Sequence, residues 1–226
     1  MICVPLTASS TDEALALMRR SFAEADMVEL RLDGTGEVNL AQLLDDAAGP
    51  VLVTNRSRRE GGLFDGTDEE RCAPILDAID HGAAYVDCEL ATAPSLVKSI
   101  IRKASAGEGK TKVILSFHDF IATPGTERLR ELVDQAFDQG CHVAKIVTTA
   151  TTLDDNLKIL DLILWASERG RPLIAFCMGP EGRISRLAAP LFGSLLTFAS
   201  LERGRESAPG QFTVQELRYM LELMRE

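Results

Sequence analysis

The 226-residue sequence lacks several features that would place it in a specialised class of protein. It has no apolar run near the ~18 residues that a transmembrane helix needs, and no basic, apolar leader precedes its first strand-like run. Positive charge is scarce, since 24 Lys and Arg stand against 34 Asp and Glu and the net charge is −10. These absences predict a cytoplasmic protein and argue against a phosphate-tracking binder of nucleic acid or a membrane protein.

Patterned cysteine and histidine are also missing. The five cysteines, at positions 3, 72, 88, 141 and 177, form no CxxC pair and no regular spacing. Scattered thiols in odd number are typical of a reducing cytoplasm. The three histidines are far apart in the sequence, with no HxH or HxxxH, so no metal site is predicted.

What the sequence does contain is an alternation of short apolar runs with amphipathic stretches. Strands are predicted at 2–6, 27–32, 51–55, 84–90, 112–117, 142–147, 172–178 and 195–199. Helices are predicted near 10–24, 39–48, 67–81, 94–105, 126–139, 153–169, 182–189 and 213–225. Eight β-then-α units without a Pro/Gly/Ser-rich linker predict an α/β protein, a (β/α)₈ TIM barrel that forms one compact domain over residues 1–226.

Some local signals support this assignment. Thr126 and Thr213 are predicted helix caps, and Thr152 with Asp155 resembles a capping box. The stretch "ASAGEGKT" (104–111) is one residue short of a phosphate-binding P-loop. It follows a helix and precedes a strand, the reverse of the P-loop order, so it is predicted to be a surface loop.

In such a barrel the chemistry lies at the C-terminal ends of the strands, on their inward faces. In "VELRLD" the period of two places Glu29, Arg31 and Asp33 on one face, with the leucines toward the helices. These charges point into the barrel mouth, unless they form a structural ion pair at the strand end. Arg56 and Glu60 follow the third strand, where a loop could aim both at a ligand.

The fifth and sixth predicted strands carry a histidine and a lysine. His118 lies just past the end of "VILSF", where an isolated histidine is often only a packed or capping residue. Lys145 shares a face with Val143 and Val147 in the middle of an apolar strand, whereas His142 points the other way, toward the helix layer. His118 is therefore the base expected within reach of Lys145.

A lysine beside a histidine in a barrel mouth has a definite chemical use. Burial disfavours the charged form of an amine, and a neutral amine can attack a ketone to form a Schiff base. The protonated imine then acts as an electron sink for loss of a neighbouring C–H proton. A histidine can take that proton and return it to a leaving group.

Six segments, in order, carry a resemblance that covers nearly the whole chain: "ELRLD", "RSRREGG", "SFHDF", "AKIV", "MGPEGRISR" and "SAPGQF". Together they resemble type I 3-dehydroquinate dehydratase, a lyase of the shikimate pathway of aromatic amino acid biosynthesis. The resemblance implies a barrel without metal or organic cofactor that converts 3-dehydroquinate to 3-dehydroshikimate and water. It also implies a homodimer.

The resemblance assigns roles to nine residues. Lys145 matches the Schiff-base lysine, His118 the general acid and base, and Glu60 the carboxylate that orients the histidine. The substrate contacts fall on Glu29, Arg31, Arg56, Arg186, Ser207 and Gln211. The guanidinium of Arg186 suits the substrate carboxylate, and residues 207–211 are expected to close over the substrate.

Two departures and two rival functions complete the prediction. Asn55 stands where many relatives have an aromatic residue, and Pro5 where some have serine, so both could alter the pocket.

A class I aldolase would also use a Schiff base, but no Gly-rich phosphate loop is evident near strands seven and eight. A barrel that only binds a carboxylate would need Arg186 but not Lys145 and His118.

Overall fold

The computed structural model describes residues 1–106 and 111–224. The strands are β1 (Ile2–Leu6), β2 (Met27–Arg31), β3 (Val51–Thr54), β4 (Tyr85–Glu89), β5 (Lys112–His118), β6 (Val143–Thr149), β7 (Leu173–Met178), β8 (Thr197–Ser200) and the short β9 (Phe212–Thr213). The helices are α1 (Thr11–Phe22), α2 (Leu40–Asp45), α3 (Asp68–Asp80), α4 (Pro94–Ala106), α5 (Thr126–Asp138), α6 (Asp154–Ser167), α7 (Arg183–Phe192) and α8 (Val214–Leu223).

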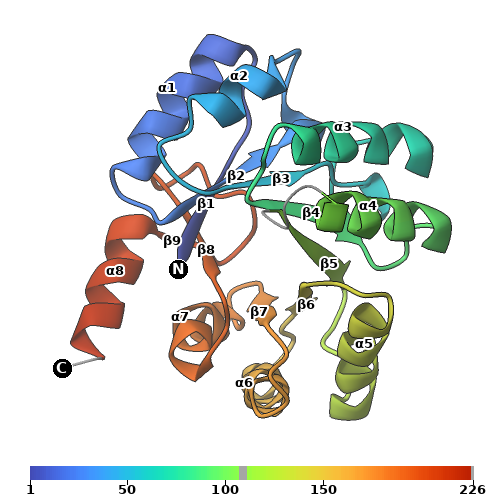
Figure 1. Ribbon diagram of the computed structural model, residues 1–226. Helices are drawn as coiled ribbons and strands as arrows, with labels where there is room; N and C mark the ends of the chain where they lie inside the picture. The colour runs from blue at the N-terminus through green and yellow to red at the C-terminus, as the bar shows by residue number, and fades with distance from the viewer. Residues whose placement is uncertain (107–110, 225–226) are drawn as a thin grey trace.

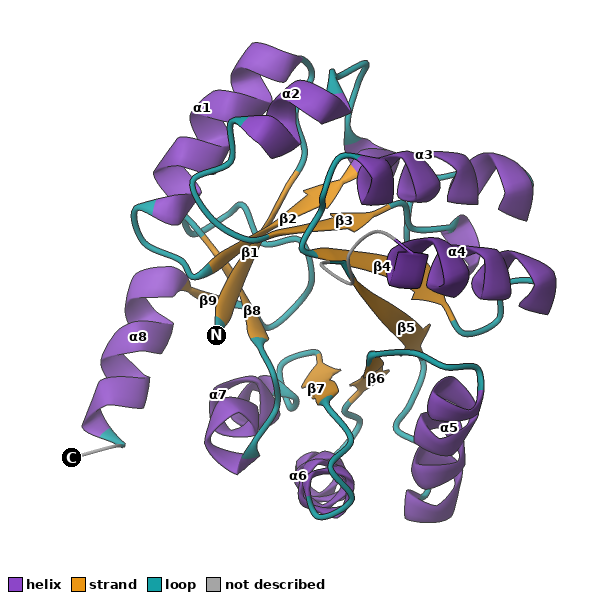
Figure 2. Cartoon of the chain, in the orientation of Figure 1, coloured by secondary structure: helices purple, strands orange, loops and turns teal. Residues whose placement is uncertain are grey.

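The strands curl into a barrel enclosed by the helices, as Figure 1 shows. All pairs are parallel, in the order β7-β6-β5-β4-β3-β2-β1-β8-β9. The barrel closes between β7 and β8, where Leu195 N donates to Leu173 O at 2.8 Å. Helices and strands alternate along the chain (Figure 2), and the predicted (β/α)₈ barrel is confirmed.

The inward and outward faces of the strands contribute to separate apolar clusters. Ile114, Val143 and Val147 belong to a cluster inside the barrel, which also holds Phe176 and Phe198. A larger cluster fills the space between strands and helices and contains Leu30 and Ile146, which alternate with the inward residues. The period-two assignment of inward and outward faces is therefore confirmed for β2, β5 and β6.

The ends of the helices and strands differ from the predicted ends by at most three residues, and local capping explains part of this difference. Thr213 forms the expected cap in a capping box with Glu216. Thr126 is not a cap, because Gly125 holds that position. Asp155 accepts hydrogen bonds from the backbone N–H groups of residues 151 and 152, yet the N-cap of α6 is Leu153, so the capping box predicted there is wrong.

Two predicted elements extend beyond the residues that the structure describes. The loop predicted within 104–111 includes residues 107–110, and the helix predicted to residue 225 extends past 224; both lie in part outside the described residues. Within residues 1–106 and 111–224, no helix is long and apolar enough to cross a membrane.

Candidate active site

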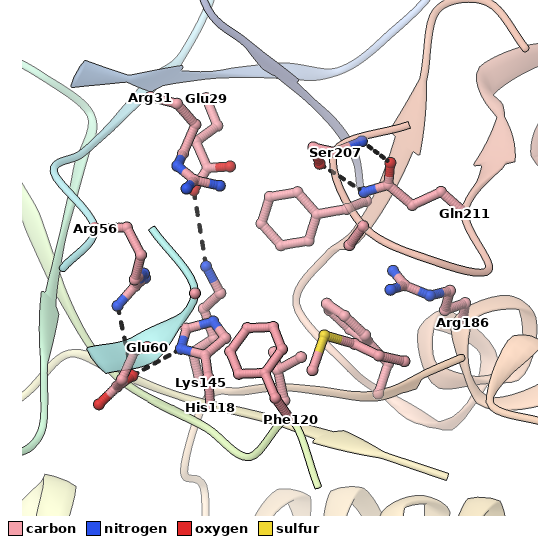
Figure 3. A pocket seen from close by; sticks show the side chains of 16 residues that line it. Glu29, Arg31, Arg56, Glu60, His118, Phe120, Lys145, Arg186, Ser207 and Gln211 are labelled. Atoms are coloured by element: carbon pink, nitrogen blue, oxygen red, sulfur yellow. Dashed lines mark hydrogen bonds and ion pairs between the residues drawn. The ribbon is translucent and has the colours of Figure 1, made fainter. Parts of the chain in front are cut away.

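One cavity at the C-terminal ends of the strands gathers every predicted site residue (Figure 3). Its volume is about 560 Å³ including its opening to solvent. The predicted residues in its lining are Glu29, Arg31, Arg56, Glu60, His118, Lys145, Arg186, Ser207 and Gln211. Apolar walls come from Phe120, Val147, Phe176, Met178 and Phe198. The nine residues that the sequence predicted for the site therefore line one cavity. The role of each residue in catalysis or binding stays a prediction.

Lys145 projects from the middle of β6 into this cavity. It is only 4% exposed, which places its amine inside the barrel. Nζ lies 2.9 Å from Asp87 Oδ2 and 3.7 Å from Glu29 Oε1, and 4.8 Å from the centre of the Phe198 ring. Two carboxylates therefore accompany the buried amine, in addition to the apolar ring of Phe198.

Asp87 is the functional candidate that the sequence analysis missed. It lies on β4, is 1% exposed, and receives hydrogen bonds from Lys145 Nζ and, at 2.6 Å, from Ser116 Oγ. Its other partner is Arg56, whose Nη2 lies 2.7 Å from Asp87 Oδ1. The missed signal was a carboxylate within the apolar run "AYVDCEL", on the same alternating face as Tyr85.

His118 ends β5 and is held by Glu60. Nδ1 lies 2.8 Å from Glu60 Oε2, which leaves Nε2 for the cavity. Burial, helped by the charges of Arg56 and Lys145, holds the pKa of His118 well below its usual value. Burial also raises the pKa of Glu60 to about 7, although Arg56, whose Nη1 lies 3.7 Å from its Oε2, opposes that change. A neutral imidazole and a carboxyl that titrates near neutrality suit the exchange of protons.

Arg31 reaches the cavity while paired with Asp33. Arg31 Nε and Nη2 donate to the two oxygens of that carboxylate at 2.9 and 2.8 Å. Asp33 also accepts from the backbone N–H groups of Arg56 and Leu63, so it connects β2 with the loop after β3. The structural ion pair left open by the sequence is present, and Arg31 lines the cavity at the same time.

Arg186 on α7 is the least satisfied charge in the cavity. It is 1% exposed; Nη2 donates to Pro209 O at 3.2 Å, and its Nε and Nη1 make no hydrogen bond to the described residues. Burial lowers the pKa of Arg186 to about 10, so the guanidinium remains charged at neutral pH. A buried cation with free donors is suited to an anionic group of a ligand.

Ser207 and Gln211 face each other in the segment after β8. Ser207 N donates to Gln211 Oε1 at 2.9 Å, and Gln211 Nε2 donates to Ser207 Oγ at 3.0 Å. The carbonyl of Pro209 rests on Arg186 and also accepts from Gly179 N at 3.3 Å. This segment therefore forms one wall of the cavity and contacts α7 through its own backbone.

Four other residues lie outside the cavity lining. His142 is exposed just before β6, and its Nδ1 accepts a hydrogen bond from Val113 N, at the opposite end of the strands from His118. Asn55 donates to Arg71 O, and Pro5 lines a neighbouring cleft, so neither departure changes the cavity wall directly. Arg58 is exposed, and its Nη1 forms an ion pair with Asp65 at 3.0 Å.

Metal binding has no evident place in the described part of the chain. Across residues 1–106 and 111–224, no group of three or more His, Cys, Asp or Glu side chains could hold a metal ion. The cations of the cavity other than Arg186 are instead paired with carboxylates: Arg31 with Asp33, Lys145 with Asp87, and Arg56 with Asp87, Glu60 and Glu89.

Comparison with known proteins gives the family to which the chain belongs. The sequence model of the family described as "Type I 3-dehydroquinase" matches residues 2–226. The 3-dehydroquinate dehydratase of Desulfotalea psychrophila is 36% identical over 96% of this chain and 95% of its own length. That of Methanocaldococcus jannaschii is 36% identical over 99% of both chains.

The crystal structure of the type I 3-dehydroquinate dehydratase from Clostridium difficile has the same fold. It superposes with a TM-score of 0.87 at 28% identity, covering 99% of this chain and 91% of that one. The family match over nearly the whole sequence, the similar relatives and the shared barrel give one answer: the chain belongs to the type I 3-dehydroquinate dehydratases, a family of hydro-lyases.

Proposed function

We propose that this protein dehydrates 3-dehydroquinate to 3-dehydroshikimate through a Schiff base on Lys145. The observation that carries the proposal is the shared cavity of a buried amine, a His118–Glu60 pair and the unsatisfied guanidinium of Arg186. An amine supplies the nucleophile, an imidazole supplies the acid and base, and a guanidinium supplies the carboxylate contact.

The first half of the reaction forms the imine. Arg186 binds the substrate carboxylate and orients the C3 ketone toward Lys145. The amine of Lys145, once it has lost its proton, adds to C3, and the carbonyl oxygen becomes a hydroxyl. His118 assists the proton transfers by which this hydroxyl leaves as water, and a protonated imine remains.

The second half eliminates water from the ring. His118 Nε2 takes a proton from C2, and the C–H electron pair moves toward the iminium nitrogen to give an enamine. His118 then returns the proton to the C1 hydroxyl, which leaves as water while the C1–C2 double bond and the iminium form. Water finally hydrolyses the imine, releasing the product and the amine.

The remaining residues hold the substrate or its catalysts. Glu60 orients His118 and accepts part of its charge. Glu29, Arg31, Arg56, Ser207 and Gln211 bind the ring hydroxyls and the reacting carbonyl, and residues 207–211 close over the bound substrate. The Clostridium difficile relative is described with a covalently modified comenic acid, which supports covalent chemistry in this family.

The cellular role follows from the same reaction. The barrel acts as a single catalytic domain over residues 1–226 in the shikimate pathway of aromatic amino acid biosynthesis. A cytoplasmic location is proposed as well, because the five cysteines are buried free thiols.

Reductive trapping tests the mechanism. Borohydride added with 3-dehydroquinate should inactivate the protein irreversibly and leave one ligand equivalent on the peptide that contains Lys145. Lys145→Ala should lose both the label and the formation of the conjugated enone, and Lys158→Ala on the surface of α6 should keep both. Label on another lysine, or full activity of Lys145→Ala, would defeat the proposal.

We also propose that the protein forms a homodimer through α6 and α7. Large apolar side chains are exposed along this pair of helices: Leu153, Leu157, Leu164, Ile184, Leu191 and Phe192. Acidic Asp154 begins α6 and basic Arg169 follows its end. A two-fold axis that sets two α6 helices antiparallel would bring these opposite charges together and bury the apolar side chains, so a second copy of the chain fits this face.

Sedimentation analysis tests the dimer. Leu157→Asp should convert a dimer to a monomer at micromolar concentration, because it places a charge within the apolar face. Tyr219→Asp is the matched control, since Tyr219 is equally exposed at 64% but lies on α8. A monomeric wild-type protein would contradict the proposal, as would a dimer unaffected by Leu157→Asp.

A further inference from the structure

Asp87 occupies an unusual position for a carboxylate. It lies beneath the cavity rather than in its lining, 1% exposed in the middle of the barrel. Each of its oxygens faces a cation: Oδ2 lies 2.9 Å from Lys145 Nζ, and Oδ1 lies 2.7 Å from Arg56 Nη2. Ser116 Oγ adds a hydrogen bond to Oδ1 at 2.6 Å. This carboxylate is therefore fixed in orientation with one oxygen directed at the proposed nucleophile.

The ionised form of Asp87 is strongly favoured. Burial alone would raise the pKa of this carboxyl, but the charges of Arg56 and Lys145 hold the pKa well below its usual value. Asp87 is thus a permanent negative charge beside an atom whose own charge changes in the proposed reaction.

We propose that Asp87 is the counter-ion of the protonated imine formed on Lys145. This rests on the proposed Schiff-base mechanism and adds a role for a residue that contacts the reacting nitrogen. The nitrogen is cationic in the resting ammonium and again in both iminium intermediates, and it remains attached to the lysine side chain throughout. The same oxygen of Asp87 can therefore face the positive charge before and after the C–N bond forms.

The chemistry explains why a fixed counter-ion is useful. Only the protonated imine withdraws the electron pair released when the C2 proton moves to His118; a neutral imine is a weak electron sink. A cation enclosed in a barrel with Arg56 nearby would tend to lose its proton. Asp87 opposes that loss, and Arg56 on its other oxygen moderates the attraction, so that the later enamine, with a neutral nitrogen, is still accessible.

Other groups around Lys145 are less suited to the role. Glu29 on β2 is 3.7 Å from Nζ, and its Oε1 accepts a hydrogen bond from Thr54 at 2.8 Å. Cys3 on β1 is a buried thiol whose pKa is raised well above its usual value, so it carries no charge at neutral pH. His118 on β5 is neutral when its pKa is lowered by burial, and Phe198 on β8 offers only its ring face. Asp87 has the shortest charged contact.

A comparison of two reductants tests the proposal. Borohydride reduces both neutral and protonated imines, whereas cyanoborohydride reduces the protonated form. With 3-dehydroquinate at pH 8, wild-type protein should be labelled at Lys145 by both reagents. Asp87→Asn should keep the borohydride label and lose cyanoborohydride labelling by at least about 10-fold, because without the counter-ion the imine pKa should fall at least about one unit below the assay pH.

Two control variants separate this role from a structural one. Glu89→Gln removes a carboxylate that also pairs with Arg56, at 3.2 Å from its Nη1, but has no contact with Lys145, so its labelling ratio should match the wild type. Glu29→Gln removes the more distant carboxylate and should change the ratio less than Asp87→Asn. An unchanged ratio in Asp87→Asn, or a larger loss in Glu29→Gln, would overturn the proposal.

A spectroscopic measurement on the wild-type protein makes the test independent of how the variants fold. With ¹⁵N at lysine Nζ, the imine nitrogen should keep the chemical shift of an iminium between pH 6 and 9. A shift that titrates to the neutral imine within this range would overturn the counter-ion role. Absence of any imine signal or borohydride label in the wild type would instead reject the Schiff-base mechanism itself, so the two failures are distinguishable.

Discussion

Arg186 shows most directly how one residue can be interpreted from its unsatisfied atoms. Its Nε and Nη1 lack hydrogen-bond partners among the described residues, so a substrate carboxylate would be their main partner. Breaking a desolvated guanidinium–carboxylate contact is costly. Arg186→Ala should therefore raise KM at least ~10-fold, about 1.4 kcal/mol, in steady-state assays. Arg183→Ala on the same helix is the control, and an unchanged KM in Arg186→Ala would remove this residue from the substrate site.

The two histidines of the β5–β6 region give a second test at this scale. His118→Ala should lower kcat by ~10²–10⁴, because general acid and base catalysis typically contributes that much. His142→Ala should leave kcat nearly unchanged, since that ring only accepts a hydrogen bond from Val113 N, away from the cavity. Steady-state kinetics of both variants decide the matter. The reverse pattern would mean that the base has been assigned to the wrong histidine.

Which residues could be predicted from sequence depends on the signal that each one carries. Lys145 and His118 lie in or beside apolar runs that alternate with a period of two. The face of the strand on which each side chain lies could therefore be predicted from the sequence. Asp87 interrupts its strand in the same way, but nothing local indicates that its partners are Lys145 and Arg56, which lie 58 and 31 positions away. Pairing between distant strands is a property of the closed barrel, not of any one segment.

At the scale of elements, strands were predicted more closely than helix ends. The strands are buried on both faces and appear as short continuous apolar runs. The helix ends depend on which side chain caps them, and Thr213 and Thr126 look alike in sequence although only Thr213 caps. The alternation of strands and helices was enough to predict the barrel. The residue at which α6 begins could not be predicted from the sequence.

Contacts between elements also position the site, and Asn156 on α6 is an example. Its Nδ2 donates to Glu181 O at 2.7 Å and its Oδ1 accepts from Ser185 N at 3.0 Å. It therefore holds the first turn of α7 at Ser185, the residue before Arg186. Asn156→Ala should lower the free energy of unfolding by about 1–3 kcal/mol, because buried partners lose their hydrogen bonds.

The same change should raise KM while leaving kcat nearly intact, because it displaces Arg186 without touching the reacting groups. Denaturant unfolding and steady-state kinetics measure the two effects. Asn39→Ala, which removes an exposed cap of α2, is the control and should alter stability alone. A wild-type KM in Asn156→Ala would show that α7 is held by its other contacts.

At the scale of the whole molecule, the barrel collects buried titratable groups whose protonation is coupled to folding. The pKa of Glu60 is raised to about 7, mainly by burial, so the folded protein retains a proton that the unfolded chain releases near pH 4.5. His118 is shifted the other way, since burial lowers its pKa well below the usual 6.5. The contribution of Glu60 therefore falls as pH rises from about 4.5 to 7, while that of His118 rises with pH up to about 6.5.

These opposed contributions predict how stability depends on pH. Below about pH 6.5 the two contributions oppose each other, so together they should change the wild-type free energy of unfolding less than either group would alone. Glu60→Gln removes the falling contribution, so the free energy of unfolding of this variant should rise with pH up to about pH 6.5, by at most about 1.4 kcal/mol per pH unit. His118→Asn should show the reverse, a decline with rising pH. Urea unfolding at half-unit steps of pH measures all three proteins, with Glu127→Gln on the surface of α5 as the control. If Glu60→Gln and the wild type gave parallel curves, Glu60 would not hold its proton in the folded barrel.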